Sequence, residues 1–195
     1  MKRQITRLDI MPLDQYAKVR RSMHRELTAL KENRRVHVGP DVTAYFECYE
    51  TMWHQVQEML YIEKGGDEQL EGELAAYNPL IPSGRELVAT LMFEIDDAAR
   101  RHRVLAGLGG VEETVALRFD GETVKGRPET DVDRTTADGK ASSVQFIHFP
   151  FTDGQIAKFR TSGLHVMLAI EHPRYHHLAV LPEPVRAALA GDFDP

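Results

Sequence analysis

The sequence predicts an α+β protein with a largely antiparallel sheet flanked by helices and with an amphipathic, basic helix near the N-terminus. Short runs of β-branched and aromatic residues are numerous, and turn-forming pairs such as Asp120-Gly121 separate some of them. Hairpin turns join antiparallel strands, whereas neighbouring parallel strands need long crossovers. Several neighbouring strands are therefore joined by turns instead of helices, which favours the α+β class.

The individual elements follow from periodicity and from turn residues. Apolar residues recur three or four positions apart from Tyr16 to Leu30, which indicates a helix with Asp14 as its N-cap. Residues 126–141 are polar and predict a mobile hairpin tip. The predicted helices are residues 14–33, 47–64, 67–77, 96–108, 152–159 and 182–190. The predicted strands are residues 35–38, 42–46, 86–95, 114–119, 143–149, 164–170 and 178–181.

The composition is typical of one globular domain, which we assign to residues 1–195, with residues 1–33 as an N-terminal helical arm. The chain has 195 residues, of which 42% are hydrophobic and 28% are charged, and this is sufficient for a single core. A single cysteine, Cys48, excludes an intramolecular disulfide and a cysteine-based zinc site. The sequence contains no apolar leader and no run near the ~18 apolar residues that span a membrane. We therefore expect a cytoplasmic protein.

Charge is distributed unevenly along the chain. Residues 1–37 hold ten Lys/Arg and four Asp/Glu, a net charge of +6; since the whole chain carries −6, the remainder carries −12. One interpretation is a docking face for an acidic partner or a phosphate-bearing ligand. On the first helix, Arg20, Arg21 and Arg25 would form this face. The alternative is a solvated helix face, or a basic helix that lies on the acidic remainder. The negative total argues against nucleic acid as the partner.

One face of the helix predicted over residues 47–64 carries groups that could bind a metal. Glu47, Glu50, His54, Glu58 and Tyr61 follow one another at intervals of three or four residues, so a helix presents them on one side. Carboxylates and an imidazole are ligands for iron, manganese or zinc. The alternative is an ordinary solvated face with contacts between glutamates and the histidine.

A second group of titratable residues follows the strand predicted over residues 164–170. His172, His176 and His177 lie close together around Pro173, and His148 on another predicted strand could approach them. Imidazoles that converge in this way can bind a metal or a phosphate. We therefore add His172 and His176 to the candidate metal ligands. The alternative is a turn with surface histidines.

Several segments together resemble one bacterial family of unknown function. They are Leu8-Asp9-Ile10-Met11-Pro12-Leu13, Arg35-Val36-His37-Val38-Gly39-Pro40, Gln57-Glu58-Met59-Leu60, Ala76-Tyr77-Asn78-Pro79-Leu80-Ile81-Pro82 and His172-Pro173-Arg174-Tyr175. In this order they span nearly the whole chain and resemble the family filed as domain of unknown function 3501. The resemblance implies no established activity and no catalytic residues. Because genes of that family often neighbour those of rubrerythrin-like and iron–sulfur oxidoreductase proteins, it implies a role near peroxide or iron handling.

Two hypotheses follow. The first is an accessory or binding protein in redox, oxidative-stress or iron metabolism, which docks a rubrerythrin-like or iron–sulfur partner through its basic helix. The second is a small metal-dependent enzyme that uses the Glu/His cluster to hold iron, manganese or zinc, which activates water or a peroxide. A homo-oligomer is compatible with either hypothesis.

Overall fold

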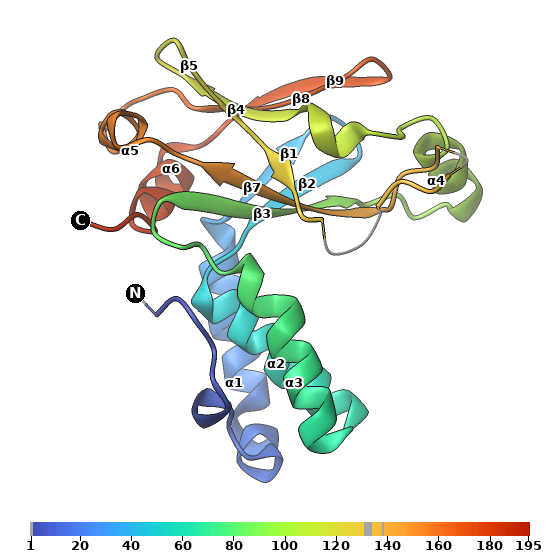
Figure 1. Ribbon diagram of the computed structural model, residues 1–195, viewed down its shortest axis with the longest axis vertical. Coiled ribbons are helices and arrows are strands. Elements are labelled where there is room, and N and C mark those ends of the chain that lie inside the picture. Colours follow the sequence, from blue (N-terminus) through green and yellow to red (C-terminus); the bar gives the residue numbers. More distant parts are fainter. Residues whose placement is uncertain (1, 131–133, 138) are drawn as a thin grey trace.

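The protein consists of two stacked antiparallel sheets and a group of three helices that projects from one of them (Figure 1). The computed structural model describes residues 2–130, 134–137 and 139–195. Helices and strands mix without a regular alternation, which confirms the predicted α+β class.

The first sheet has the strand order β1-β2-β3-β7-β6, and the second has the order β5-β4-β8-β9. Every pairing in both sheets is antiparallel. The turn between β4 and β5 contains Asp120 and Gly121, whose φ angles are 46° and 74°, as the favoured two-residue hairpin turn requires. The strands of the first sheet are β1 (Arg35–Val38), β2 (Val42–Phe46), β3 (Glu86–Phe93), β6 (Arg127–Pro128) and β7 (Val144–Pro150). Those of the second sheet are β4 (Val115–Phe119), β5 (Glu122–Lys125), β8 (Met167–His172) and β9 (Tyr175–Val180).

The main core lies between the two sheets because alternate residues of each strand point inward. On β3 the inward side chains include Leu87, Leu91 and Phe93, and they join one buried cluster with residues of the second sheet such as Leu117 and Leu168. Three helices border this part of the molecule: α4 (Ala98–Leu105), α5 (Asp153–Phe159) and α6 (Glu183–Ala190).

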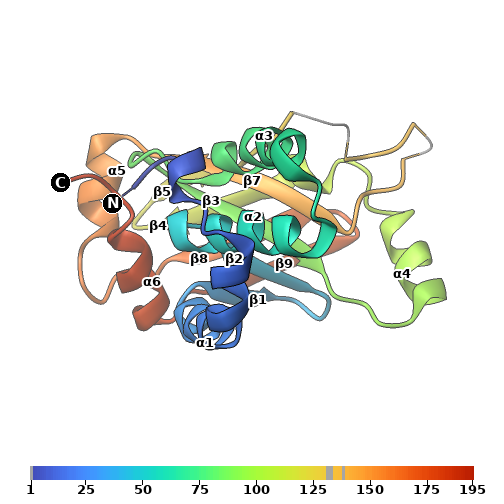
Figure 2. The same cartoon turned by 90° about the horizontal axis from the view of Figure 1, so that it is seen from below.

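The outer face of the first sheet supports the other three helices: α1 (Leu13–Glu32), α2 (Tyr49–Glu63) and α3 (Gly66–Tyr77). Seen from below, α2 lies between α1 and α3 (Figure 2). A second apolar cluster joins them to the sheet through residues such as Met52, Val56 and Val88. Short 3₁₀ helices at Arg7–Asp9, Asn78–Leu80 and Val111–Thr114 complete the fold.

The structure corrects several predicted boundaries. Helix α1 has Pro12 as its N-cap, and Asp14 lies in its first turn. Helix α2 begins two residues after Glu47, with Cys48 as the N-cap, so Glu47 is not on the helical face predicted for it. The strands predicted at residues 164–170 and 178–181 correspond to β8 and β9, which form one hairpin over residues 167–180. The helix predicted over residues 96–108 corresponds to α4, which is shorter than predicted.

The segment 126–141, predicted as a mobile hairpin tip, contains strand β6 and leads toward β7. Strand β6 pairs with β7, and an isolated bridge joins Thr135 to Ala141. Residues 131–133 and 138 of this segment lie outside the described residues, and mobility stays a prediction. Among the helices that the structure describes, none has the length and apolar character needed to cross a membrane.

Candidate metal centre

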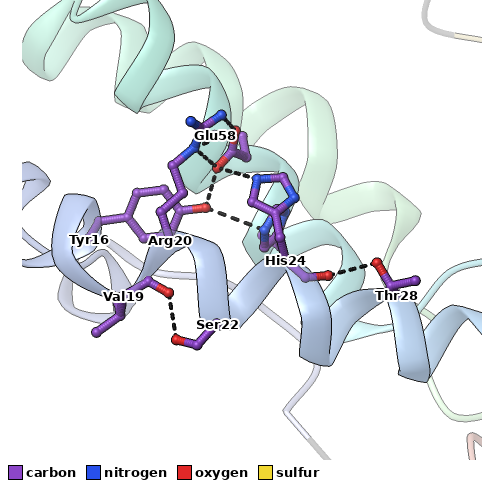
Figure 3. Close-up of polar contacts among 8 residues, drawn as sticks. Tyr16, Val19, Arg20, Ser22, His24, Thr28 and Glu58 are labelled. Atoms are coloured by element: carbon purple, nitrogen blue, oxygen red, sulfur yellow. Dashed lines mark hydrogen bonds and ion pairs between the residues drawn. The ribbon is translucent and has the colours of Figure 1, made fainter.

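The cluster of interest lies where α1 contacts α2 (Figure 3). Tyr16, Arg20 and His24 follow one another at intervals of four residues on α1, and His54 and Glu58 have the same spacing on α2. Residues four apart lie on one face of a helix. The two faces meet, and Tyr16, His54 and Glu58 are buried at the contact.

The Glu58 carboxylate is the centre of this cluster. Its Oε1 accepts a short hydrogen bond from the Tyr16 hydroxyl and a second one of 2.9 Å from Arg20 Nε. Its Oε2 accepts from Arg20 Nη2 at 2.8 Å. His24 Nε2 lies 3.2 Å from Oε1. The planar guanidinium fork therefore fixes the plane of the carboxylate.

These contacts determine which groups are charged. Hydrogen bonding from Arg20 lowers the pKa of Glu58 to about 2, so this carboxylate is ionised at neutral pH. Burial raises the pKa of the Tyr16 hydroxyl, and its hydrogen bond to Glu58 raises it further, so the phenol keeps its proton. Burial and the neighbouring His24 lower the pKa of His54. A neutral imidazole and an ionised carboxylate are the forms that bind metals.

The side chains of His24, His54 and Glu58 could hold a metal ion. One ligand atom from each of them lies within 4.8 Å of those of the other two. The two imidazole rings are 4.7 Å apart at their centroids and nearly perpendicular, so they approach each other without stacking. Two imidazoles and one carboxylate form a ligand set that suits zinc, iron or manganese.

A cavity of about 310 Å³ adjoins the cluster and shares His54 with it. It lies between α1 and the first half of α2, and Glu26 and Glu50 are the acidic residues in its wall. Its volume is at the lower end of the range of small-molecule sites. The remaining lining residues are apolar or aromatic: Met23, Leu27, Leu30, Tyr49 and Trp53.

The structure separates the acidic residues that the sequence grouped on one helix face. Glu58 and His54 belong to the cluster of possible metal ligands, whereas Glu47 and Glu50 do not. Glu50 lines the 310 Å³ cavity. The Glu47 carboxylate accepts hydrogen bonds from Thr51 on α2 and from Thr90 on β3.

The histidines near Pro173 do not converge either. His172 and Tyr175 are paired at the end of the β8–β9 hairpin, and His176 is paired with Glu171 one step further along. Successive residues of a strand point to opposite faces of the sheet, so His176 and His177 diverge. His148 lies on β7, between Glu86 and Glu129.

The three arginines of the predicted docking face have different surroundings. Arg20 binds Glu58, so its guanidinium contributes to the contact between the two helices. Arg21 and Arg25 are exposed on α1. Arg21 and Arg25 therefore present their charge to solvent, whereas the charge of the half-exposed Arg20 is paired with Glu58.

Sequence reasoning missed His24, Tyr16 as a polar partner, and the role of Arg20. The available signal was the interval of four residues from Tyr16 through Arg20 to His24, which matches the interval from His54 to Glu58. Tyr16 was assigned only to the apolar stripe, and Arg20 only to the basic face. The pairing of α1 with α2 is a tertiary contact, and the sequence contains no local indication of it.

The fold and the cluster together place the protein in a structural class: two-sheet α+β proteins with a His/Glu cluster between two projecting helices. The model of a family described as a protein of unknown function, DUF3501, matches residues 4–193, and the chain belongs to this family. It is similar to a crystal structure described as a novel protein of unknown function from Burkholderia pseudomallei, with 38% sequence identity and a TM-score of 0.91. That match covers 98% of this chain and 100% of the other. No curated protein matches the sequence.

Proposed function

We propose that the protein is a small metal-dependent enzyme that binds one divalent ion of zinc, iron or manganese through His24, His54 and Glu58. The observation that carries the proposal is the mutual approach of their ligand atoms to within 4.8 Å. The adjoining cavity of about 310 Å³ would receive a small, largely apolar substrate.

The protonation states of the ligands favour this proposal. Because Arg20 keeps Glu58 ionised and burial keeps His54 neutral, neither group has to release a proton at neutral pH before it binds a metal. Tyr16 and Arg20 would act as positioning residues, since both hold the carboxylate from the side of α1. An ion with free coordination positions would polarise a water or a substrate oxygen.

The first test is metal binding by the full-length protein. After chelator treatment, titration with Zn²⁺, Mn²⁺ and anaerobic Fe²⁺ by calorimetry should give one ion per chain for at least one of them. His24→Ala and His54→Ala should each weaken that binding by about a hundredfold or more. Each removes one of three direct protein ligands, and loss of an outer-shell partner alone costs about 10–100-fold. His176→Ala is the matched control, since His176 is an exposed histidine outside the cluster.

Two results would overturn the proposal: wild-type protein that binds none of the three ions, or equal binding by wild type, His24→Ala and His54→Ala. Circular dichroism of each variant separates loss of a ligand from loss of the fold. If His176→Ala alone weakened binding, the metal would belong to the β8–β9 hairpin.

A second proposal concerns the accessory role in redox, oxidative-stress or iron metabolism that the family resemblance implies. The observation that favours it is the exposure of Arg21 and Arg25 on α1, where they could contact an acidic surface of a rubrerythrin-like or iron–sulfur protein. The two proposals are compatible, because the faces of α1 that they use are different.

A further inference from the structure

A second and larger cavity lies between the helices and the outer face of the first sheet. Its volume is about 480 Å³, which is within the range of small-molecule sites. It is distinct from the cavity beside His54, because the two share none of their lining residues. The ionisable and aromatic side chains in its wall are Lys31, Arg35, Tyr45, Glu47, Tyr77 and Phe146.

The Glu47 carboxylate is the most buried charged group in this wall, and Glu47 is only 6% exposed. Its Oε1 accepts a hydrogen bond of 2.6 Å from Thr90, and its Oε2 accepts one of 2.6 Å from Thr51. Both donors are neutral hydroxyls. Within the described ranges, Glu47 forms no ion pair with a basic side chain. The charge of the buried Arg34 guanidinium acts on Glu47 without a direct hydrogen bond to its carboxylate. Each carboxylate oxygen can therefore still accept a charge-assisted hydrogen bond, which would offset part of the cost of burying the charge.

Positive charge lies at another part of the same cavity. Arg35 is paired with Tyr45 across β1 and β2, and Tyr45 is paired with Thr90 across β2 and β3. Directly paired residues share a face of the sheet, and two strand spacings amount to about 10 Å. Arg35 is therefore about that far from Thr90, which binds Glu47. Lys31 Nζ lies 5.8 Å from the centre of the Tyr45 ring, so a second cation is on the same side.

We propose that this cavity binds a small zwitterion with a terminal ammonium group, an apolar spacer and a carboxylate. The ammonium group donates hydrogen bonds to Glu47, and Lys31 and Arg35 attract the carboxylate. The spacer contacts the aromatic wall formed by Tyr45, Tyr77 and Phe146. Because the two charges have opposite signs and are separated by an apolar surface, they select the length of the ligand and the orientation in which it binds. This inference is independent of the proposed metal centre, because it uses none of its residues.

The experiment compares three probes of equal chain length by calorimetry: ε-aminocaproate, caproate and hexylamine. Wild-type protein should bind ε-aminocaproate about tenfold or more tightly than either compound with one charged end. Glu47→Gln should remove the preference over caproate, because the ammonium group loses its charged partner. The double variant Lys31→Met, Arg35→Gln should remove the preference over hexylamine.

Two further variants control for effects on folding. Glu50→Gln makes the same chemical change in the other cavity and should leave both preferences unchanged. Met92→Trp adds bulk to the wall at a residue that is 36% exposed, and it should abolish binding without altering Glu47. If Glu47→Gln fails to fold, unchanged binding by Met92→Trp overturns the inference. Wild-type protein that does not prefer ε-aminocaproate to the other two probes overturns the inference as well. So does folded Glu47→Gln protein that still prefers ε-aminocaproate to caproate.

Discussion

Two histidines, one buried and one partly buried, respond to their surroundings in opposite ways. Burial and the neighbouring His24 lower the pKa of His54 from 6.5. Hydrogen bonds to Glu86 and Glu129 raise the pKa of His148 from the same value, against the effect of its own burial. At each histidine, folding therefore changes proton affinity, and stability must depend on pH.

The sign of that dependence differs between the two residues. Below pH 6.5 the unfolded chain binds a proton at His54 more readily than the folded chain does, so the contribution of His54 to stability is lost as the pH falls. The contribution of His148 is complete below pH 6.5 and is lost as the pH rises through its raised folded pKa.

In metal-free protein, His54→Gln should reduce the loss of stability on acidification, and His148→Gln should destabilise more at acidic than at alkaline pH. Urea unfolding between about pH 5 and pH 8 measures both effects. If His54→Gln and His148→Gln changed the pH dependence of stability in the same direction, the opposite signs assigned to the two histidines would be wrong.

At the scale of elements, α1 has two faces with different surroundings. Tyr16, Arg20 and His24 contact α2, whereas Arg21 and Arg25 are exposed. A single helix therefore contributes His24 to the His/Glu cluster on one side and presents positive charge on the other. This separation follows from the helical period, because residues 20 and 24 share a face that residues 21 and 25 do not.

Charge reversal of the exposed face tests the proposed docking. The double variant Arg21→Glu, Arg25→Glu should abolish capture of a rubrerythrin-like or iron–sulfur partner at low salt, because contacts between surface charges govern encounter. Its metal affinity should stay that of wild type. The double variant Arg103→Glu, Lys125→Glu makes the same charge change at exposed residues elsewhere and should capture normally. Capture that is unaffected by reversal at residues 21 and 25 would exclude α1 as the docking surface.

The elements also show how far the sequence determines the candidate site. Helical periodicity placed His54 and Glu58 on one face correctly, because that relation is local. The position of His24 against them depends on the packing of α1 on α2, which no local pattern encodes. For a related reason, the sequence left two interpretations open for the histidines near Pro173: converging metal ligands, or surface histidines at a turn. The sequence indicated a turn, but antiparallel pairing extends to His172 and Tyr175 and leaves only Pro173 and Arg174 between the strands.

At the scale of the whole molecule, a buried ion pair joins segments that are far apart in the sequence. Arg34, between α1 and β1, binds Asp192 near the C-terminus, and the two residues are 5% and 1% exposed. Arg34 also donates hydrogen bonds to the main-chain oxygens of Phe46 and Glu47, just before α2. One guanidinium thus connects the end of the sandwich beside α6 to the base of the projecting helices.

Neutralising Asp192 should therefore destabilise the protein as a whole. Asp192→Asn preserves shape but leaves the Arg34 charge without its counterion, and the loss of one partner of a buried pair costs about 3 kcal/mol or more. The carbonyl acceptors of Arg34 remain, which places the expected value near the lower limit. Asp194→Asn is the control: this carboxylate also pairs with an arginine, Arg3, but its side chain is 60% exposed, and solvent screens such pairs. In urea unfolding, Asp192→Asn should lower the urea concentration at the midpoint far more than Asp194→Asn does. Helix content, measured by circular dichroism, and tryptophan fluorescence should both be lost in a single transition. Equal effects of the two variants would show that the buried pair does not hold the two parts of the molecule together.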